Sequence, residues 1–168
     1  MEFRINILES FFIGTMATIA IDIWAIILKK IFNLPTTNWG MVGRWFGHIP
    51  RGTLVHRPIG AAAEIRYENA IGWGLHYVIG IIYAYLYLFL VFDITTNGPS
   101  LGSAILFGLA TVVVPWFVLQ PGLGLGVLAR CTEKPNLIRS ISLSVHTIFG
   151  ASLYFGWLIT SLFLSTSQ

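Results

Sequence analysis

Residues 10–28 read SFFIGTMATIAIDIWAIIL, an apolar run that contains one acid, Asp22, and is followed by two basic residues, Lys29 and Lys30. A helix needs about 20 residues to cross the hydrocarbon core of a bilayer, because each residue adds about 1.5 Å. The run is longer than the apolar part of a signal peptide, and its positive charges follow it instead of preceding it. We therefore predict that residues 10–28 form a retained transmembrane helix.

Three further apolar stretches meet the same length criterion, and the composition agrees with them. Hydrophobic residues make up 55% of the 168 residues and charged residues only 10%, whereas a soluble domain carries about 25% charged residues. The sequence predicts an all-α polytopic membrane protein, with one membrane domain over residues 1–168. Its four transmembrane helices are expected at about 10–28, 70–92, 101–119 and 141–164, and its larger loops at 29–69 and 120–140.

The basic residues lie on one side of this topology. Nine of the ten Lys and Arg residues fall in the loops 29–69 and 120–140, and Arg4 is the exception. Loops rich in Lys and Arg stay in the cytoplasm, so both loops are predicted to be cytoplasmic and both termini outside. With a net charge of +3, the basic loops favour the bilayer and its anionic headgroups as partners, not nucleic acid.

Two pairs of segments suggest an internal repeat. The sequence ATIAID at 17–22 resembles ATVVVP at 110–115, and HYVIG at 76–80 resembles HTIFG at 146–150. Each repeat would hold two helices, so both repeats would keep the same orientation in the membrane. The pattern therefore indicates two tandem helical hairpins.

Three ionisable residues lie at a similar predicted depth on three different helices. Asp22, His76 and His146 each fall five or six residues inside the expected basic end of a helix, roughly 7–9 Å below the boundary. A carboxylate at a helix centre costs about 2.5–3.5 kcal/mol to insert, which favours an interior position. Thr18, one turn from Asp22, can hydrogen-bond to it, and Gln120 could reach the same layer.

This layer has several interpretations. It could bind a proton or a cation in a small transporter or permeation protein. It could instead lock helices together in a structural or assembly subunit, since intramembrane polar groups often serve only as interhelical hydrogen bonds. Two histidines on different helices could also ligate a b-type haem, although the acid at the same level argues against an apolar haem pocket. The sequence assigns no metal.

A second candidate site lies in the first basic loop, where residues 39–52 read WGMVGRWFGHIPRG. Arg44 and His48 would share a face if this stretch is helical, and Pro50 should end any such helix. With Arg51 and His56 they form a set suited to a lipid headgroup or another anionic ligand. The alternative interpretation is an interfacial anchor built on the tryptophans.

The combined motifs resemble a known family. They are Asp22–Trp24, Gly43–His48, Arg51–Gly52, Gly72–Tyr77 and Gln120–Gly122, together with His56, Gly124, His146, Gly150 and Tyr154. This set is similar to that of the bacterial membrane family called domain of unknown function 2938. The resemblance implies a small multi-span protein of the bacterial inner membrane, and it implies no particular reaction.

The sequence does not indicate an enzyme. It contains no nucleophile elbow, no HExxH motif and no paired carboxylates, and the glycines at 122–126 do not match a nucleotide-binding loop. The single cysteine, Cys131, excludes an internal disulfide. Four helices make a small bundle, which is compatible with a homodimer.

Overall fold

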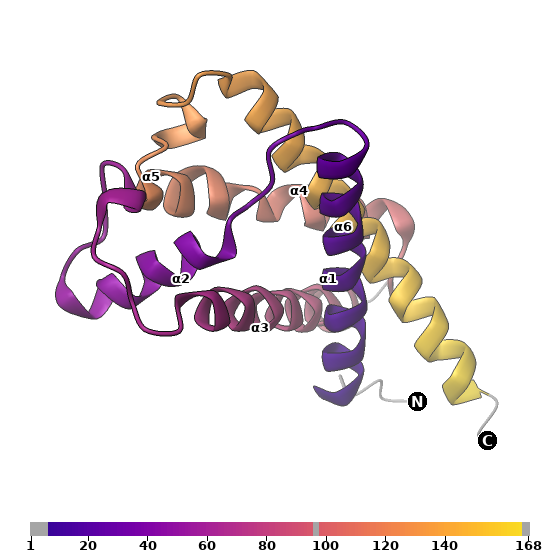
Figure 1. Cartoon of the computed structure of the whole chain (residues 1–168). Helices are drawn as coiled ribbons and strands as arrows, with labels where there is room; N and C mark the ends of the chain where they lie inside the picture. Colours follow the sequence, from indigo (N-terminus) through magenta and orange to yellow (C-terminus); the bar gives the residue numbers. More distant parts are fainter. Residues whose placement is uncertain (1–6, 96–97, 166–168) are drawn as a thin grey trace. The chain divides into compact units, whose positions relative to one another are not determined.

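A computed structural model of the chain describes residues 7–95 and 98–165, and Figure 1 labels its principal helices. Within these ranges the chain is helical and contains no strand. Arg4, the one basic residue predicted on the opposite side, and both chain ends lie outside the described residues.

Four helical stretches are long and apolar enough to cross a membrane, as predicted. They cover Ile7–Lys30, Glu68–Ile94, Leu101–Leu123 and Pro135–Phe163. The first is α1 (Ile7–Lys30). The second joins α3 (Glu68–Phe89) to a π-helical turn, η3 (Leu90–Ile94). The third contains α4 (Leu101–Thr111), a second π-helical turn, η4 (Pro115–Leu119), and α5 (Gln120–Leu123), and the fourth is α6 (Pro135–Ser165). The all-α prediction with four apolar helices is therefore confirmed.

The helix ends differ from the predicted ends around the third loop. The third stretch continues four residues past the predicted end at 119, and α6 begins at Pro135 instead of 141. Pro115 and Pro121 lie inside this helical stretch, at the starts of η4 and α5, and each removes one backbone N–H from the helix. Gly124, with a φ of 88°, then ends α5 in the left-handed conformation.

The first basic loop contains ordered helices. It holds α2 (Trp39–His48) and two 3₁₀ turns, η1 (Ile49–Arg51) and η2 (Ile59–Ala61). The Asn38 side chain accepts a hydrogen bond of 3.3 Å from the Met41 N–H and so caps α2. The helix ends at His48, two residues before Pro50, as the sequence predicted.

The chain divides into two compact units. The first comprises the described parts of Met1–Ile27, Tyr77–Ala110 and Val145–Gln168, and the second comprises Leu28–His76 and Thr111–Ser144. Both α3 and α6 begin in the second unit and continue into the first. The single membrane domain stays a prediction.

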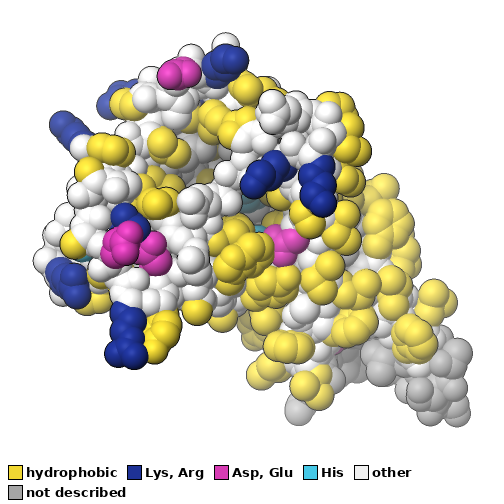
Figure 2. All heavy atoms as spheres, viewed as in Figure 1, with side chains coloured by type: hydrophobic (Ala, Val, Ile, Leu, Met, Phe, Trp, Pro, Cys, Tyr) yellow, Lys and Arg dark blue, Asp and Glu magenta, His cyan; other side chains and the backbone are white. Residues whose placement is uncertain are grey.

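The first unit is the apolar part of the chain. Its core consists of fully or nearly fully buried side chains, namely Ile13, Ala17, Ala84, Tyr87, Leu88, Val91, Ala104, Phe149 and Leu153. Many of its large apolar side chains, including Phe11, Ile82 and Phe155, are exposed, and hydrophobic side chains cover much of its visible surface in Figure 2. All Lys and Arg residues of the described chain belong to the second unit. The first unit is therefore the part suited to lipid contact.

Within the first unit, each proposed hairpin is closed by a glycine contact. A Cβ added to Gly14 on α1 would lie 2.5 Å from the Ile81 Cα and 2.8 Å from the Gly80 carbonyl on α3. A Cβ added to Gly108 on α4 would lie 2.7 Å from the Gly150 Cα on α6. Small residues let helix backbones approach this closely in membranes. Both hairpins thus use a glycine four residues after a histidine, which supports the proposed repeat.

The second unit has its own smaller core of Val42, Ile59 and Leu123, against which several side chains pack, including Trp39 and Trp45. The Trp45 Nε1–H donates to the Leu54 carbonyl at 2.8 Å. A Cβ at Gly122 would overlap the Trp45 indole ring. Segments 39–62 and 119–125 therefore pack together in this unit.

Candidate functional site

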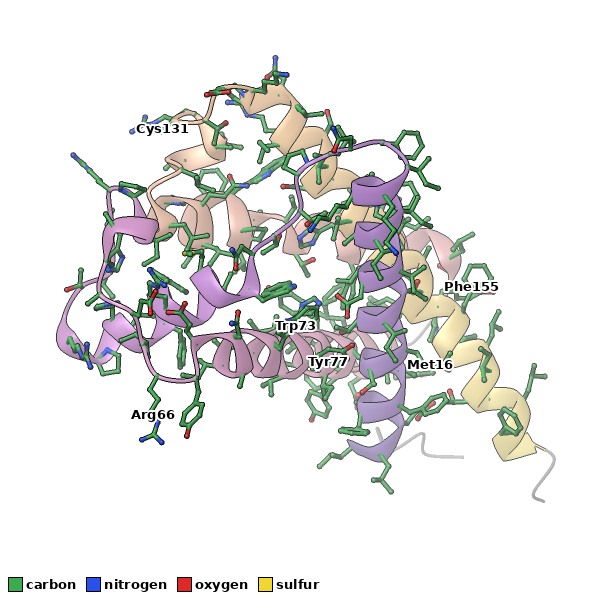
Figure 3. All side chains as sticks on the ribbon, in the orientation of Figure 1. Met16, Arg66, Trp73, Tyr77, Cys131 and Phe155 are labelled. Carbon is green, nitrogen blue, oxygen red and sulfur yellow. The ribbon has the colours of Figure 1, made fainter. Side chains whose placement is uncertain are left out.

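The carboxylate of Asp22 has a defined partner in the first unit. Tyr77, on α3, donates its hydroxyl hydrogen to Asp22 Oδ2 on α1 at 2.9 Å, and Figure 3 shows Tyr77 beside α1. Both residues are partly buried. A hydrogen bond to an ionised acceptor is roughly twice as strong as one between neutral groups. The phenol therefore gives the carboxylate of Asp22 a strong hydrogen-bond donor from another helix.

His146, on α6, forms a hydrogen bond with the neighbouring helix α4. Its Nδ1 lies 3.2 Å from the Gly108 carbonyl on α4. Because a carbonyl only accepts, Nδ1 carries the hydrogen. The close approach at Gly108 brings this carbonyl within reach, so one substitution there would disturb both the packing and the hydrogen bond.

His76 lies among aromatic rings in the second unit. Its ring stacks on Trp39 of α2 with centroids 3.9 Å apart and an interplanar angle of 24°. Trp73 approaches its edge at 5.8 Å, and only 8% of His76 is exposed. These ring contacts join the start of α3 to α2 within the second unit.

Asp22, His76 and His146 therefore each have a structural partner inside their own unit. The observed helix ends also change the predicted depths. Counted from the ends of α1 and α3, Asp22 and His76 both lie eight residues in, about 12 Å. Counted from Pro135, His146 lies eleven residues in, about 16 Å. The convergence of the three groups stays a prediction.

Thr18 and Gln120 were the other two residues predicted to contact the layer of Asp22, His76 and His146. Thr18 donates its hydroxyl hydrogen to the Gly14 carbonyl of its own helix at 2.7 Å and not to Asp22. A threonine in a helix commonly bonds to the carbonyl four residues earlier, and Thr18 is fully buried against Gly80. Gln120 is only 6% exposed, and its Oε1 has no hydrogen-bond partner among the described residues.

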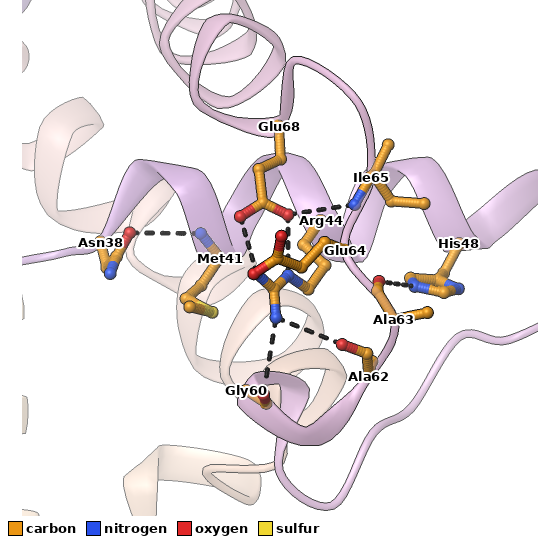
Figure 4. A network of polar contacts seen from close by, with 10 residues as sticks. All are labelled: Asn38, Met41, Arg44, His48, Gly60, Ala62, Ala63, Glu64, Ile65 and Glu68. Atoms are coloured by element: carbon orange, nitrogen blue, oxygen red, sulfur yellow. Dashed lines mark hydrogen bonds and ion pairs between the residues drawn. The ribbon is translucent and has the colours of Figure 1, made fainter.

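Arg44 lies at the centre of a polar network in the second unit (Figure 4). Its Nε and Nη2 donate to the two carboxylate oxygens of Glu68 at 2.8 and 2.7 Å. Its Nη1 donates to the carbonyls of Ala62 at 3.2 Å and Gly60 at 3.5 Å, and Glu64 lies 3.5 Å from Nη2. Hydrogen bonding to Glu68 raises the pKa of Arg44 above its ordinary value.

The contacts of Arg44 stabilise the first basic loop, and they leave its guanidinium group unavailable to an external ligand. The side chain is 6% exposed, and a bidentate carboxylate already fills the fork that would bind a headgroup phosphate. His48 Nε2 donates to the Ala63 carbonyl at 2.9 Å, next to the Ala62 carbonyl bound by Arg44. The two residues share a face of α2, as predicted, and together bind segment 60–63.

The other two predicted residues of this loop differ from each other. Arg51, on η1, is exposed and makes no hydrogen bond or ion pair with the described residues. His56 is 8% exposed. Its backbone N–H donates to the Gly122 carbonyl at 3.0 Å, and its ring lies 5.1 Å from that of His48, centroid to centroid. The structure thus pairs His48 with His56 and leaves Arg51 outside.

Sequence reasoning missed three residues of these sites: Tyr77, Glu68 and Trp39 as a ring partner of His76. Tyr77 directly follows His76 in the sequence. Its hydroxyl is a hydrogen-bond donor at nearly the same position along its helix, so it was a candidate partner for Asp22. Glu68 lies just before the predicted start of a helix, and a buried arginine requires an acid. Trp39 was interpreted only as an interfacial residue.

Within residues 7–95 and 98–165, no group of three or more His, Cys, Asp or Glu side chains is placed to hold a metal ion. Four long apolar helices and a compact basic unit define the class of protein: a multi-pass helical membrane protein. The chain belongs to the family described as protein of unknown function, DUF2938, whose model matches residues 11–160. No curated protein and no solved structure shows significant similarity to the chain.

Proposed function

We propose that this chain is a small permeation protein that passes a proton or a small cation, with Asp22 as the group that binds it. The observation that carries the proposal is the 2.9 Å hydrogen bond from Tyr77 to Asp22 between two apolar helices. An ionisable side chain inside a membrane helix is costly and commonly marks an ion or proton route. The phenol offsets part of that cost while leaving the carboxylate able to accept a proton.

The proposed orientation follows the basic loops. The second unit, with every described Lys and Arg, would face the cytoplasm and anionic headgroups of a bacterial inner membrane, and both termini would lie outside. Cys131 is exposed in this unit and is the only cysteine of the chain. A membrane-impermeant maleimide should therefore label inverted vesicles and not right-side-out cells; the opposite pattern would reverse the orientation.

The permeation proposal can be tested without knowing a substrate. Purified protein is reconstituted into vesicles that contain a pH-sensitive dye, and a potassium gradient with valinomycin drives protons inward. Wild-type protein should acidify the lumen faster than empty vesicles, and Asp22→Asn should abolish the difference. Tyr77→Phe keeps the carboxylate but removes its donor, so it should give an intermediate rate.

A matched control is Asp93→Asn, which makes the same substitution at an exposed position on η3. This variant should retain the wild-type rate. Repeating the assay with sodium or potassium as the only gradient distinguishes cation from proton movement. Equal rates for wild type and Asp22→Asn under all three gradients would contradict the proposal.

A structural or assembly subunit is the second candidate, and His146 favours it. The imidazole joins α6 to α4 through the Gly108 carbonyl, which is the role of a residue that locks helices together. On this hypothesis His76→Leu and His146→Leu destabilise the protein, a partner protein co-purifies, and Asp22→Asn has no effect on flux. The haem hypothesis rests on sequence spacing alone, and a purified protein without a Soret band would exclude it.

A further inference from the structure

We infer that His48 and His56 form a binding site for a first-row transition metal ion of the kind that prefers imidazole, such as Zn²⁺. The two rings come from different segments, the end of α2 and the loop between η1 and η2. Both side chains are at least nine-tenths buried, at 9% and 8% exposed. This site is independent of the Asp22 proposal.

The hydrogen bonds of the two rings determine where their lone pairs lie. His48 Nε2 lies 2.9 Å from the Ala63 carbonyl, and His56 Nδ1 lies 3.4 Å from the Gly122 carbonyl. Because a carbonyl only accepts, each of these nitrogens carries the hydrogen. The neutral rings therefore keep a lone pair on His48 Nδ1 and on His56 Nε2. A carbonyl bound to the other ring nitrogen is the usual support of a metal-ligating histidine.

The separation of the rings matches that of two ligands on one ion. In a zinc site the nitrogen lies about 2.1 Å from the metal and the ring centre roughly 1.1 Å farther away. Two imidazoles on a tetrahedral ion then have ring centres about 5.2 Å apart. The centroids of His48 and His56 are 5.1 Å apart, with the ring planes at 61°.

A buried atom without a partner points to a ligand at this position. His56 Nε2 is buried and has no hydrogen-bond partner among the residues that the structure describes, which is uncommon for a polar atom in a folded protein. A metal ion would satisfy this lone pair. A single buried water could also donate a hydrogen bond to this atom. The binding experiment below distinguishes a metal ion from a water.

The site has two protein nitrogens, in agreement with the absence of any three-residue His, Cys, Asp or Glu cluster among the described residues. The remaining coordination positions would belong to water, carbonyl oxygen or an incoming ligand. Zinc sites with open positions hold exchangeable ligands, whereas structural sites are closed by four protein ligands. We therefore expect reversible binding, not a metal that is required for folding.

The test measures Zn²⁺ binding by calorimetry, and Co²⁺ binding by visible absorption, on detergent-solubilised protein whose purification tag has been removed. His48→Gln keeps an N–H at the Nε2 position for the Ala63 carbonyl but has no lone pair at Nδ1. His56→Asn keeps an N–H for the Gly122 carbonyl but removes Nε2. Both variants should fold and lose saturable binding, and Zn²⁺ should raise the melting temperature of the wild type but of neither variant.

The control is Cys131→Ser, which removes an exposed thiol of the second unit, a side chain of a kind that also binds zinc, and should bind Zn²⁺ as the wild type does. Binding that persists in both His48→Gln and His56→Asn would show a site elsewhere and overturn the inference. A wild-type protein that binds neither Zn²⁺ nor Co²⁺ would also overturn it and would leave a buried water as the partner of His56. Neither result depends on the flux assay.

Discussion

Gly108→Ala tests how closely α4 and α6 approach each other. A Cβ at this position would lie 2.7 Å from the Gly150 Cα and 2.8 Å from its nitrogen, and closer still to the His146 carbonyl. All three are backbone atoms, so no rotamer change can relieve the overlap and the helices must separate. The same movement would lengthen the 3.2 Å hydrogen bond from His146 Nδ1 to the Gly108 carbonyl.

The magnitude follows from two opposing contributions. Overpacking a close contact costs typically 1–3 kcal/mol, and rigid backbone on both sides places this case near the upper end at about 3 kcal/mol. Alanine is a better helix former than glycine by about 1 kcal/mol. The expected net loss of stability for Gly108→Ala is therefore about 2 kcal/mol.

Gly102→Ala in the same helix is the matched control, because a Cβ added at that position would meet no other described residue within 4 Å. It should be neutral or stabilising by up to about 1 kcal/mol. Unfolding in mixed micelles with increasing denaturing detergent, followed by tryptophan fluorescence, gives both free energies. If Gly108→Ala is as stable as Gly102→Ala, α4 and α6 do not cross at this glycine and the reasoning fails. Gly14 makes the equivalent backbone contact with Gly80 and Ile81 in the other hairpin, so we expect a similar loss of stability for Gly14→Ala.

Two further variants test the polar contacts. Arg44→Lys should lower the melting temperature by several degrees, because a lysine cannot reproduce the bidentate contact with Glu68 or reach the loop carbonyls at the same time; an unchanged melting temperature would show that the network is not stabilising. Thr18→Val should change the unfolding free energy by less than about 1 kcal/mol, because the threonine hydroxyl donates within its own helix. A larger loss of stability, or a loss of proton flux, would show that the hydroxyl also acts on Asp22.

Some features of the site follow from local sequence. Arg44 and His48 are four residues apart, so they share a face once α2 forms, and Pro50 limits where α2 can end. A glycine lies four residues after both His76 and His146, and the structure has close helix contacts at Gly80 and Gly150. These predictions succeed because helical periodicity and the special backbone of glycine and proline act over a few residues.

Other features depend on residues far apart in the chain. Tyr77 and Asp22 are 55 residues apart, and His56 and Gly122 are 66 apart. Thr18 could have bonded either to Asp22 or to the carbonyl one turn earlier, and spacing permits both. Glu68 and the loop carbonyls, not an external anion, bind Arg44. Each of these choices is made by which segments pack together.

The sequence by itself determined the solvent of this protein and the number of its long helices. Both depend on summed apolar length, because about 20 apolar residues per span favour lipid regardless of what the neighbours do. Only the tertiary structure decided the partner of each buried polar side chain. A hydrogen bond requires two atoms within about 3 Å, and that distance is set by the packing of segments that are remote in sequence.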